Sequence, residues 1–145
     1  MIDVSYSSIL SIKFRITRVF FLEKSIFALK TMEKVEKHKI IVKQIVEEIA
    51  SMIPDSEPIE TQTITDDVHG HYLLSAVGWL NNRHREFNSF VHIDVKHDGK
   101  IWIQHDGTDL KIALILVERG VAKSDIVLAF HAPFRREMIP EFAVQ

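Results

Sequence analysis

The residues best suited to chemistry lie between His92 and Thr108. His92 and Asp94 are two positions apart, so on a β-strand their side chains point to the same side. Two histidines and one carboxylate are a common ligand set for transition metals, and this pair lacks one histidine. His105 is the tempting third ligand, and whether it shares a face with the pair depends on how the strands align.

A second pair of histidines, His69 and His71, would share a face in an extended chain. Gly70 between them indicates a turn instead, which weakens this pair as a ligand set. We therefore predict no metal ion and no cofactor. A metal-dependent enzyme that uses His92 and Asp94 is kept as the alternative.

Other catalytic chemistries find little support in the sequence. The chain has no cysteine, which excludes disulfides, thiol nucleophiles and cysteine-based zinc sites. It has no Gly-x-Ser-x-Gly motif, and its five glycines do not cluster into a phosphate-binding loop. We predict no catalytic residues and a protein that is not an enzyme.

Hydrophobic periodicity places the chemical residues in a sheet flanked by helices. Apolar residues recur at intervals of three, four and seven along Met32–Met52, which predicts a helix that packs on a core. A second helix is expected over Asp109–Arg119, with Thr108 as its N-cap and Gly120 just beyond its end. Runs rich in β-branched and aromatic residues predict strands at Ile59–Thr65, Tyr72–Trp79, Glu86–Lys96, Ile101–His105 and Asp125–Phe130.

The order of these elements predicts an α+β fold. Consecutive strands with short turns indicate an antiparallel sheet of four to five strands, with the helices packed on one face and the order α-β-β-β-β-α-β. Residues 32–145 are expected to form one domain, and the oligomeric state, including a homodimer, stays open. No apolar run reaches the roughly 20 residues that span a bilayer, so we expect a cytoplasmic protein without a membrane partner.

The turn after His97 decides which side chains share a face. A three-residue turn with Gly99 left-handed pairs Lys96 with Lys100 and collects the apolar residues of both strands on one face. His92, opposite Gln104, and Asp94, opposite Trp102, then occupy the other face. In this register His105 lies on the apolar side, away from His92 and Asp94. An exposed Trp102 beside these polar groups would suit a protein interface, unless a helix or loop covers it.

Residues 1–31 differ from the rest of the chain. They show no clean period and carry five basic residues against two acidic ones, a net charge of 5 − 2 = +3, which leaves −2 − 3 = −5 for the remainder. We expect an N-terminal extension, non-native or disordered, with Met32 as the biological start. The alternative is a genuine basic arm for a membrane surface or a partner. The acidic remainder argues against strong nonspecific DNA binding.

Several blocks in the second half of the chain occur in the order typical of a known family. They are Val77-Gly78-Trp79, His92-Ile93-Asp94, the run from Gly99 to Gln104, Asp106-Gly107-Thr108, Gly120-Val121, the run from Asp125 to Leu128, Phe130-His131 and the run from Glu141 to Val144. On these blocks residues 32–145 resemble the XisI family, the fdxN element excision controlling factors of cyanobacteria. Ala122, where the family often has proline, and the longer turn at His97 depart from the pattern.

The resemblance implies a noncatalytic role in programmed DNA element excision during heterocyst differentiation. It implies an XisH-type companion protein and a site-specific recombinase complex on DNA as partners. An antitoxin-like neutraliser of a companion nuclease is a further alternative. From the residues themselves, the predicted partner-binding side chains are His92, Asp94, Trp102, Gln104, Phe134 and Arg135.

Overall fold

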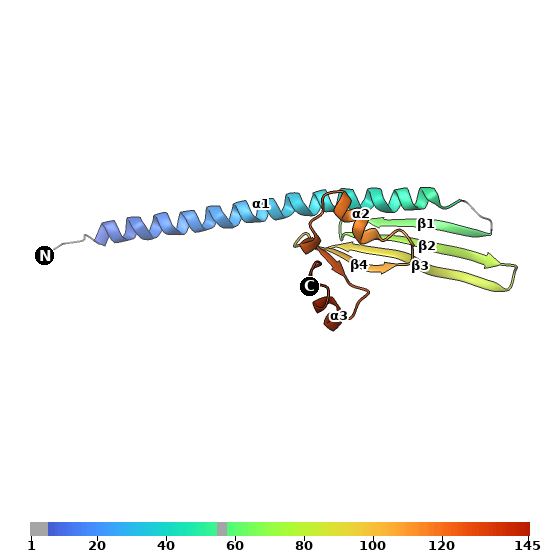
Figure 1. The fold of residues 1–145 in the computed structure, drawn as a ribbon. Helices are drawn as coiled ribbons and strands as arrows, with labels where there is room; N and C mark the ends of the chain where they lie inside the picture. The colour runs from blue at the N-terminus through green and yellow to red at the C-terminus, as the bar shows by residue number, and fades with distance from the viewer. Residues whose placement is uncertain (1–5, 55–57) are drawn as a thin grey trace.

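The longest element is a helix that extends well beyond the rest of the molecule (Figure 1). A computed structural model describes residues 6–54 and 58–145 of the chain. Its helices are α1 (Tyr6–Met52), α2 (Ile112–Glu118) and α3 (Pro133–Glu137), with a short 3₁₀ turn at Lys123–Asp125. Its strands are β1 (Ile59–Asp66), β2 (His71–Leu80), β3 (His84–Val95), β4 (Ile101–Asp106) and β5 (Ile126–Leu128).

The five strands form one sheet in the order β1-β2-β3-β4-β5. This confirms the predicted α+β fold and the predicted order of elements. The first four strands pair antiparallel, whereas β5 runs parallel to β4. The sheet is therefore mixed, because α2 carries the chain back along the sheet before β5 begins, as a crossover between parallel strands must.

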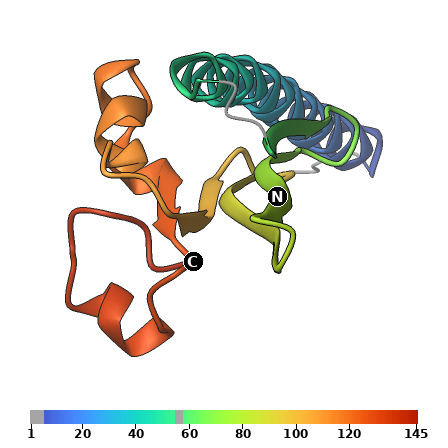
Figure 2. The ribbon, with the colours of Figure 1, turned by 90° about the vertical axis from the view of Figure 1, so that its right-hand side faces the viewer.

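The core lies between the sheet and the C-terminal half of α1. Apolar side chains of this half are buried against both hairpins and α2: Ile41, Val42, Ile45, Val46 and Ile49. The predicted core stripe is confirmed over this range, but Met52 at its end is 67% exposed. The helices α1 and α2 cover one side of the sheet, and α3 lies on the other side (Figures 1 and 2).

The N-terminal half of α1 makes no such core. Helix α1 begins at Tyr6 rather than at Met32, because residues 6–31 continue the same helix without a break. Every described side chain from Ser7 to Lys30 is exposed, including large apolar ones such as Phe14, Phe21 and Phe27. Among the described residues, no helix combines the length and the apolar character needed to cross a membrane.

Helix α2 begins differently from the prediction. Its N-cap residue is Lys111, which has a left-handed conformation with φ 56° and makes no side-chain capping bond. The Asp106 carboxylate instead accepts a hydrogen bond of 3.0 Å from the backbone N–H of Ile112, and Thr108 turns back to bond the same carboxylate. Thr108 was therefore wrong as the cap. Gly120 follows the helix with φ 86°, as predicted.

A polar cluster around Asp94

The carboxylate of Asp94 is the centre of a polar cluster on the face of the sheet opposite α1. The cluster consists of His71, His92, Asp94, Lys96 and Gln104. The Asp94 side chain is only 5% exposed, and all four neighbours donate hydrogen bonds to it. This matches the rule that a buried charge is retained where it is paired and hydrogen-bonded.

The two oxygens of the Asp94 carboxylate have different partners. Oδ1 lies 2.7 Å from Nδ1 of His71 and 2.9 Å from Nε2 of His92. Oδ2 accepts hydrogen bonds from Nζ of Lys96 at 2.7 Å and from Nε2 of Gln104 at 2.9 Å. One oxygen thus faces two imidazoles, and the other faces a cation and an amide.

Strand pairing between β2 and β3 brings His71 into the cluster. His71 lies directly opposite Asp94, so the two side chains share a face. Gly70 precedes it with φ 76°, and its carbonyl accepts a hydrogen bond of 2.8 Å from the N–H of Val95. A Cβ on Gly70 would stand 2.4 Å from the Val95 carbonyl oxygen, so only glycine fits here. From the sequence, His71 is considered only as a partner of His69 and is not placed beside Asp94.

The β3–β4 hairpin confirms part of the predicted register. The Lys96 N–H donates to the Lys100 carbonyl at 2.9 Å, Gly99 has φ 83°, and Asp94 pairs with Trp102. The turn therefore has the predicted three residues.

Beyond this point a β-bulge changes the pairing. The register shifts between His92 and Ile93, so His92 pairs with His105 and not with Gln104. The bulge adds one residue to β4. As a result the side chain of His105 lies on the same face of the sheet as His92, and that of Asp106 points toward α2. The prediction that His105 faces the apolar side was therefore wrong. His105 is exposed and still does not join the cluster, because its Nε2 lies beside Gly107.

The donors around Asp94 decide its charge. Burial alone would raise the pKa of this carboxyl, but hydrogen bonds from Lys96, His71 and Gln104 outweigh burial. The pKa of Asp94 therefore lies well below its ordinary value, and the group is an anion at neutral pH. Asp94 thus holds a negative charge against the imidazoles of His71 and His92, and Lys96 balances that charge from the other oxygen.

Trp102 borders the cluster and is half-buried rather than fully exposed. The guanidinium of Arg136 lies 5.5 Å from the centre of its ring, and Nζ of Lys96 lies 5.9 Å from it. The chain after β5 reaches this place because Ala143 pairs with Val127, the strand neighbour of Trp102. The C-terminal segment therefore partly covers Trp102 through Arg136, which is not among the predicted partner-binding residues.

The two predicted tail residues lie in α3. Phe134 is 60% exposed, and the neighbouring Arg135 is also exposed. Phe130 and Met138 add exposed apolar surface to the same segment, at 46% and 76%. Phe134 and Arg135 therefore belong to an accessible surface separate from the buried Asp94.

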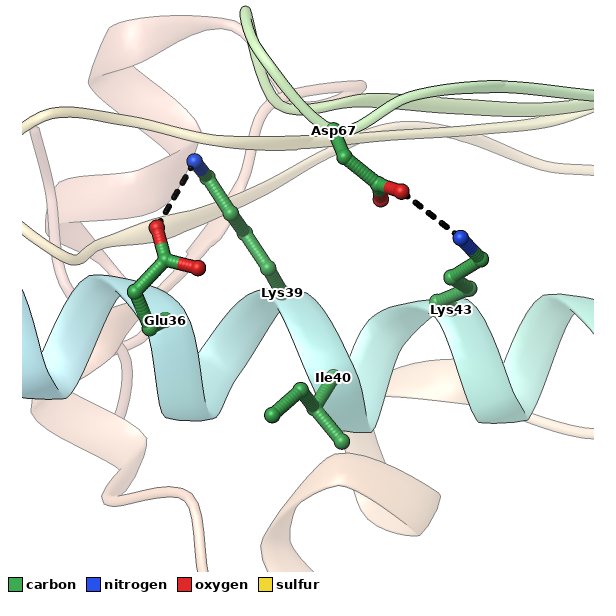
Figure 3. A pocket seen from close by; sticks show the side chains of 5 residues that line it. All are labelled: Glu36, Lys39, Ile40, Lys43 and Asp67. Atoms are coloured by element: carbon green, nitrogen blue, oxygen red, sulfur yellow. Dashed lines mark hydrogen bonds and ion pairs between the residues drawn. The ribbon is translucent and has the colours of Figure 1, made fainter.

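A shallow pocket lies on the far side of the sheet, between α1 and the β1–β2 turn (Figure 3). It is lined by Glu36, Lys39, Ile40, Lys43 and Asp67. Its charges are already paired, Lys39 with Glu36 at 3.0 Å and Lys43 with Asp67 at 2.7 Å. Asp67 also accepts a hydrogen bond of 3.0 Å from the hydroxyl of buried Tyr72, which ties the turn to the core. The Lys43–Asp67 pair fastens the hairpin to α1, whereas Lys39 and Glu36 both belong to the helix.

Comparison with known proteins identifies relatives over most of the chain. The model of the XisI protein family matches residues 32–144. A solved XisI-like protein from Anabaena variabilis is 35% identical, with a TM-score of 0.71, and the match covers 77% of this chain and 99% of that one. The fdxN element excision controlling factor XisI from the same organism is 26% identical, with a TM-score of 0.68 and the same coverage. A search of curated proteins finds no match.

Proposed function

The chain belongs to the XisI family, and from this premise we propose that it is a noncatalytic controlling factor in the excision of a DNA element. The observation that carries the proposal is the family match over residues 32–144. It is supported by the solved relative that is named as an excision controlling factor. In this proposal the protein acts with an XisH-type companion and a site-specific recombinase.

Charge favours a protein partner over direct contact with DNA. The segment that resembles the family, residues 32–145, has a net charge of −5, which follows from −2 for the whole chain and +3 for residues 1–31. Proteins that bind DNA tightly gain most of that affinity by neutralising phosphates with lysine and arginine. An acidic domain is therefore suited to recruit or restrain another protein that itself contacts DNA.

The exposed side of the C-terminal segment is the proposed docking surface. Phe134 and Arg135 stand on α3, and the same segment reaches Trp102 through Arg136. Aromatic residues and arginine are enriched at the centres of protein interfaces, where they fill pockets on the partner. His92, Asp94 and Gln104 would then support this surface from below rather than contact the partner directly.

Co-purification tests the surface. The chain is co-expressed with an XisH-type companion, and Phe134→Ala and Arg135→Ala are compared with wild type by affinity capture. We expect each substitution to reduce captured companion at least tenfold, the loss typical of an interface anchor. Phe87→Ala is the matched control. Phe87 is 76% exposed, but it lies on β3 near the β2–β3 hairpin loop, and its substitution should leave capture unchanged.

Two results would contradict the proposal. The first is equal capture of the companion by the Phe134, Arg135 and Phe87 variants, which would place the interface elsewhere. The second is tight, sequence-selective DNA binding by this protein alone in a gel shift at near-physiological salt. An excision reporter with recombinase and companion then measures the role itself, and it should require this chain.

A further inference from the structure

We propose that His71, His92 and Asp94 form a binding site for a divalent transition-metal ion, with zinc as the ion to test. Each residue offers one ligand atom, and these atoms all lie within 4.8 Å of one another. In the part of the chain that the structure describes, no other group of three histidine or acidic side chains meets in this way. Such a site does not rest on the partner role proposed above, although His92 and Asp94 enter both, and it reverses the prediction from sequence that no metal binds.

The donor atoms select the class of ion. Two imidazole nitrogens and one carboxylate oxygen suit zinc and other first-row transition metals, whereas magnesium and calcium prefer oxygen ligands throughout. Ligand atoms around a tetrahedral zinc ion stand about 3.3 Å apart, because each lies about 2.0 Å from the metal. The imidazole nitrogens are 2.7 Å and 2.9 Å from Oδ1 of Asp94, and all three ligand atoms lie within 4.8 Å of one another, so the side chains need only small adjustments to surround the ion.

The second oxygen of Asp94 is already held by other groups. Lys96 and Gln104 both donate to Oδ2, which fixes the carboxylate so that Oδ1 faces the two imidazoles. Hydrogen bonds of this kind orient ligands in established metal sites and strengthen binding. The positive charge of Lys96 is therefore accommodated, because it neutralises the oxygen that would not contact the ion.

The backbone positions all three ligands before an ion arrives. His71 and Asp94 are opposite each other on paired strands, and His92 is two residues from Asp94 on the same face. Gly70 holds the start of β2 against Val95. Ligands on paired strands lose little conformational freedom on binding, which favours affinity.

The site is accessible from solvent on one side. The side chain of His71 is 45% exposed and that of His92 is 34% exposed, whereas that of Asp94 is 5% exposed. Three protein ligands leave at least one position of a tetrahedral ion for water or for another ligand. Metal entry therefore requires no opening of the core.

Protons must leave the two nitrogens that face Asp94 when the ion binds. A carboxylate can only accept hydrogen bonds, so Nδ1 of His71 and Nε2 of His92 carry hydrogen in the metal-free protein. The ion takes the place of these hydrogens: in a neutral imidazole the hydrogen moves to the other ring nitrogen, and in a doubly protonated imidazole it is released to solvent. Binding therefore competes with protons and weakens in acid.

Titration of the metal-free protein with zinc chloride tests the site. The full chain is freed of any histidine tag, treated with chelator and titrated by calorimetry near neutral pH. We expect one ion per chain, and a dissociation constant at least tenfold weaker for His71→Ala and for His92→Ala. The matched controls are His69→Ala and His105→Ala, which remove nearby exposed histidines outside the cluster and should bind as wild type does.

Thermal unfolding provides a readout that separates metal binding from a folding defect. Zinc should raise the melting temperature of wild type and of both control variants, because an ion that binds only the folded state stabilises it. The same addition of zinc should leave the melting temperature of the His71→Ala variant unchanged. The circular dichroism spectrum of this variant should match that of wild type, which shows that it is folded. Absence of stoichiometric binding in wild type would overturn the proposal, and so would equal affinity of the His71→Ala and His105→Ala variants.

Discussion

Side chains alternate along β2, β3 and β4 between two faces that are stabilised in different ways. On the face that α1 and α2 cover, Leu74, Ile93 and Ile103 are fully buried among apolar neighbours. On the opposite face, one buried carboxylate, Asp94, gathers four polar side chains. The apolar face depends on volume and shape, whereas the polar face depends on charge. The first is suited to build the fold and the second to respond to ions, protons or a partner.

The largest effect is expected on the apolar face. Ile103→Ala should lower the free energy of unfolding by about 3 kcal/mol, since a fully buried side chain is removed and its cavity only partly closes. Urea denaturation measures the loss. Leu114→Ala on α2 is the control, because Leu114 is 47% exposed and should cost far less. Equal losses at the two positions would show that the sheet face is not the stability-determining core.

A somewhat smaller effect is expected from the polar face. Asp94→Ala should cost about 2 kcal/mol, because the donors of Lys96 and Gln104 lose the acceptor that satisfies them. Asp109→Ala serves as the control, since Asp109 is exposed in the segment before α2. A variant as stable as wild type would mean that water replaces the carboxylate without cost. The polar face would then contribute nothing measurable to the free energy of unfolding.

Acid should affect the two faces differently, because Asp94 on the polar face can take up a proton and the buried apolar side chains on the other face cannot. The pKa of this carboxyl is lower in the folded protein than its value of about 3.9 in an unfolded chain. Its contribution is therefore complete above that unfolded value and is lost as pH falls from about 4 toward the lower folded pKa. The stability difference between wild type and Asp94→Asn should shrink over this range when measured by urea denaturation. A difference that stays constant with pH would contradict a depressed pKa.

The sequence predicted the apolar face better than the polar one, for a physical reason. Burial of apolar residues has a period, so α1 from Ile41 to Ile49 and the alternation along β3 could be read directly. Pairing across strands depends on bulges, and these have no strong sequence signal. Leu80 pairs with His84 next to the hairpin loop, and a regular ladder from there would set His71 opposite Ile93.

One extra residue in β3, between the pairs Leu74–Val91 and Ser75–Ser89, moves His71 opposite Asp94 instead. A second bulge in β4 gives Asp106 its place at the start of α2. The central member of the cluster, Asp94, and its partners His92 and Gln104 were therefore predictable, but His71 was not. The predicted roles of Phe134 and Arg135 in partner binding stay predictions, because exposure alone does not identify an interface.

The bulge in β4 can be tested through the helix that it serves. Asp106→Ala should destabilise the protein by about 1 kcal/mol, since the first N–H of α2 loses its acceptor. Asp106→Asn should retain most of this stability, because the amide oxygen can still accept. Thr108→Ala is the comparison, and a larger loss at Thr108 than at Asp106 would restore the threonine as the cap.

The smallest effect should come from the part of α1 that covers neither face. Deletion of residues 1–31 removes, among the described side chains, exposed ones up to Lys30 and the half-buried Thr31, so the urea midpoint should stay within error of wild type. Deletion to residue 37 is the matched comparison, because it also removes Lys34, whose Nζ pairs with Asp125 at 2.6 Å. That longer deletion should lower stability measurably, by up to about 1 kcal/mol. Helical signal in circular dichroism should fall in both. A loss of stability in the shorter deletion would show that the N-terminal half of α1 contributes to the fold, and the apolar face would then extend beyond the sheet.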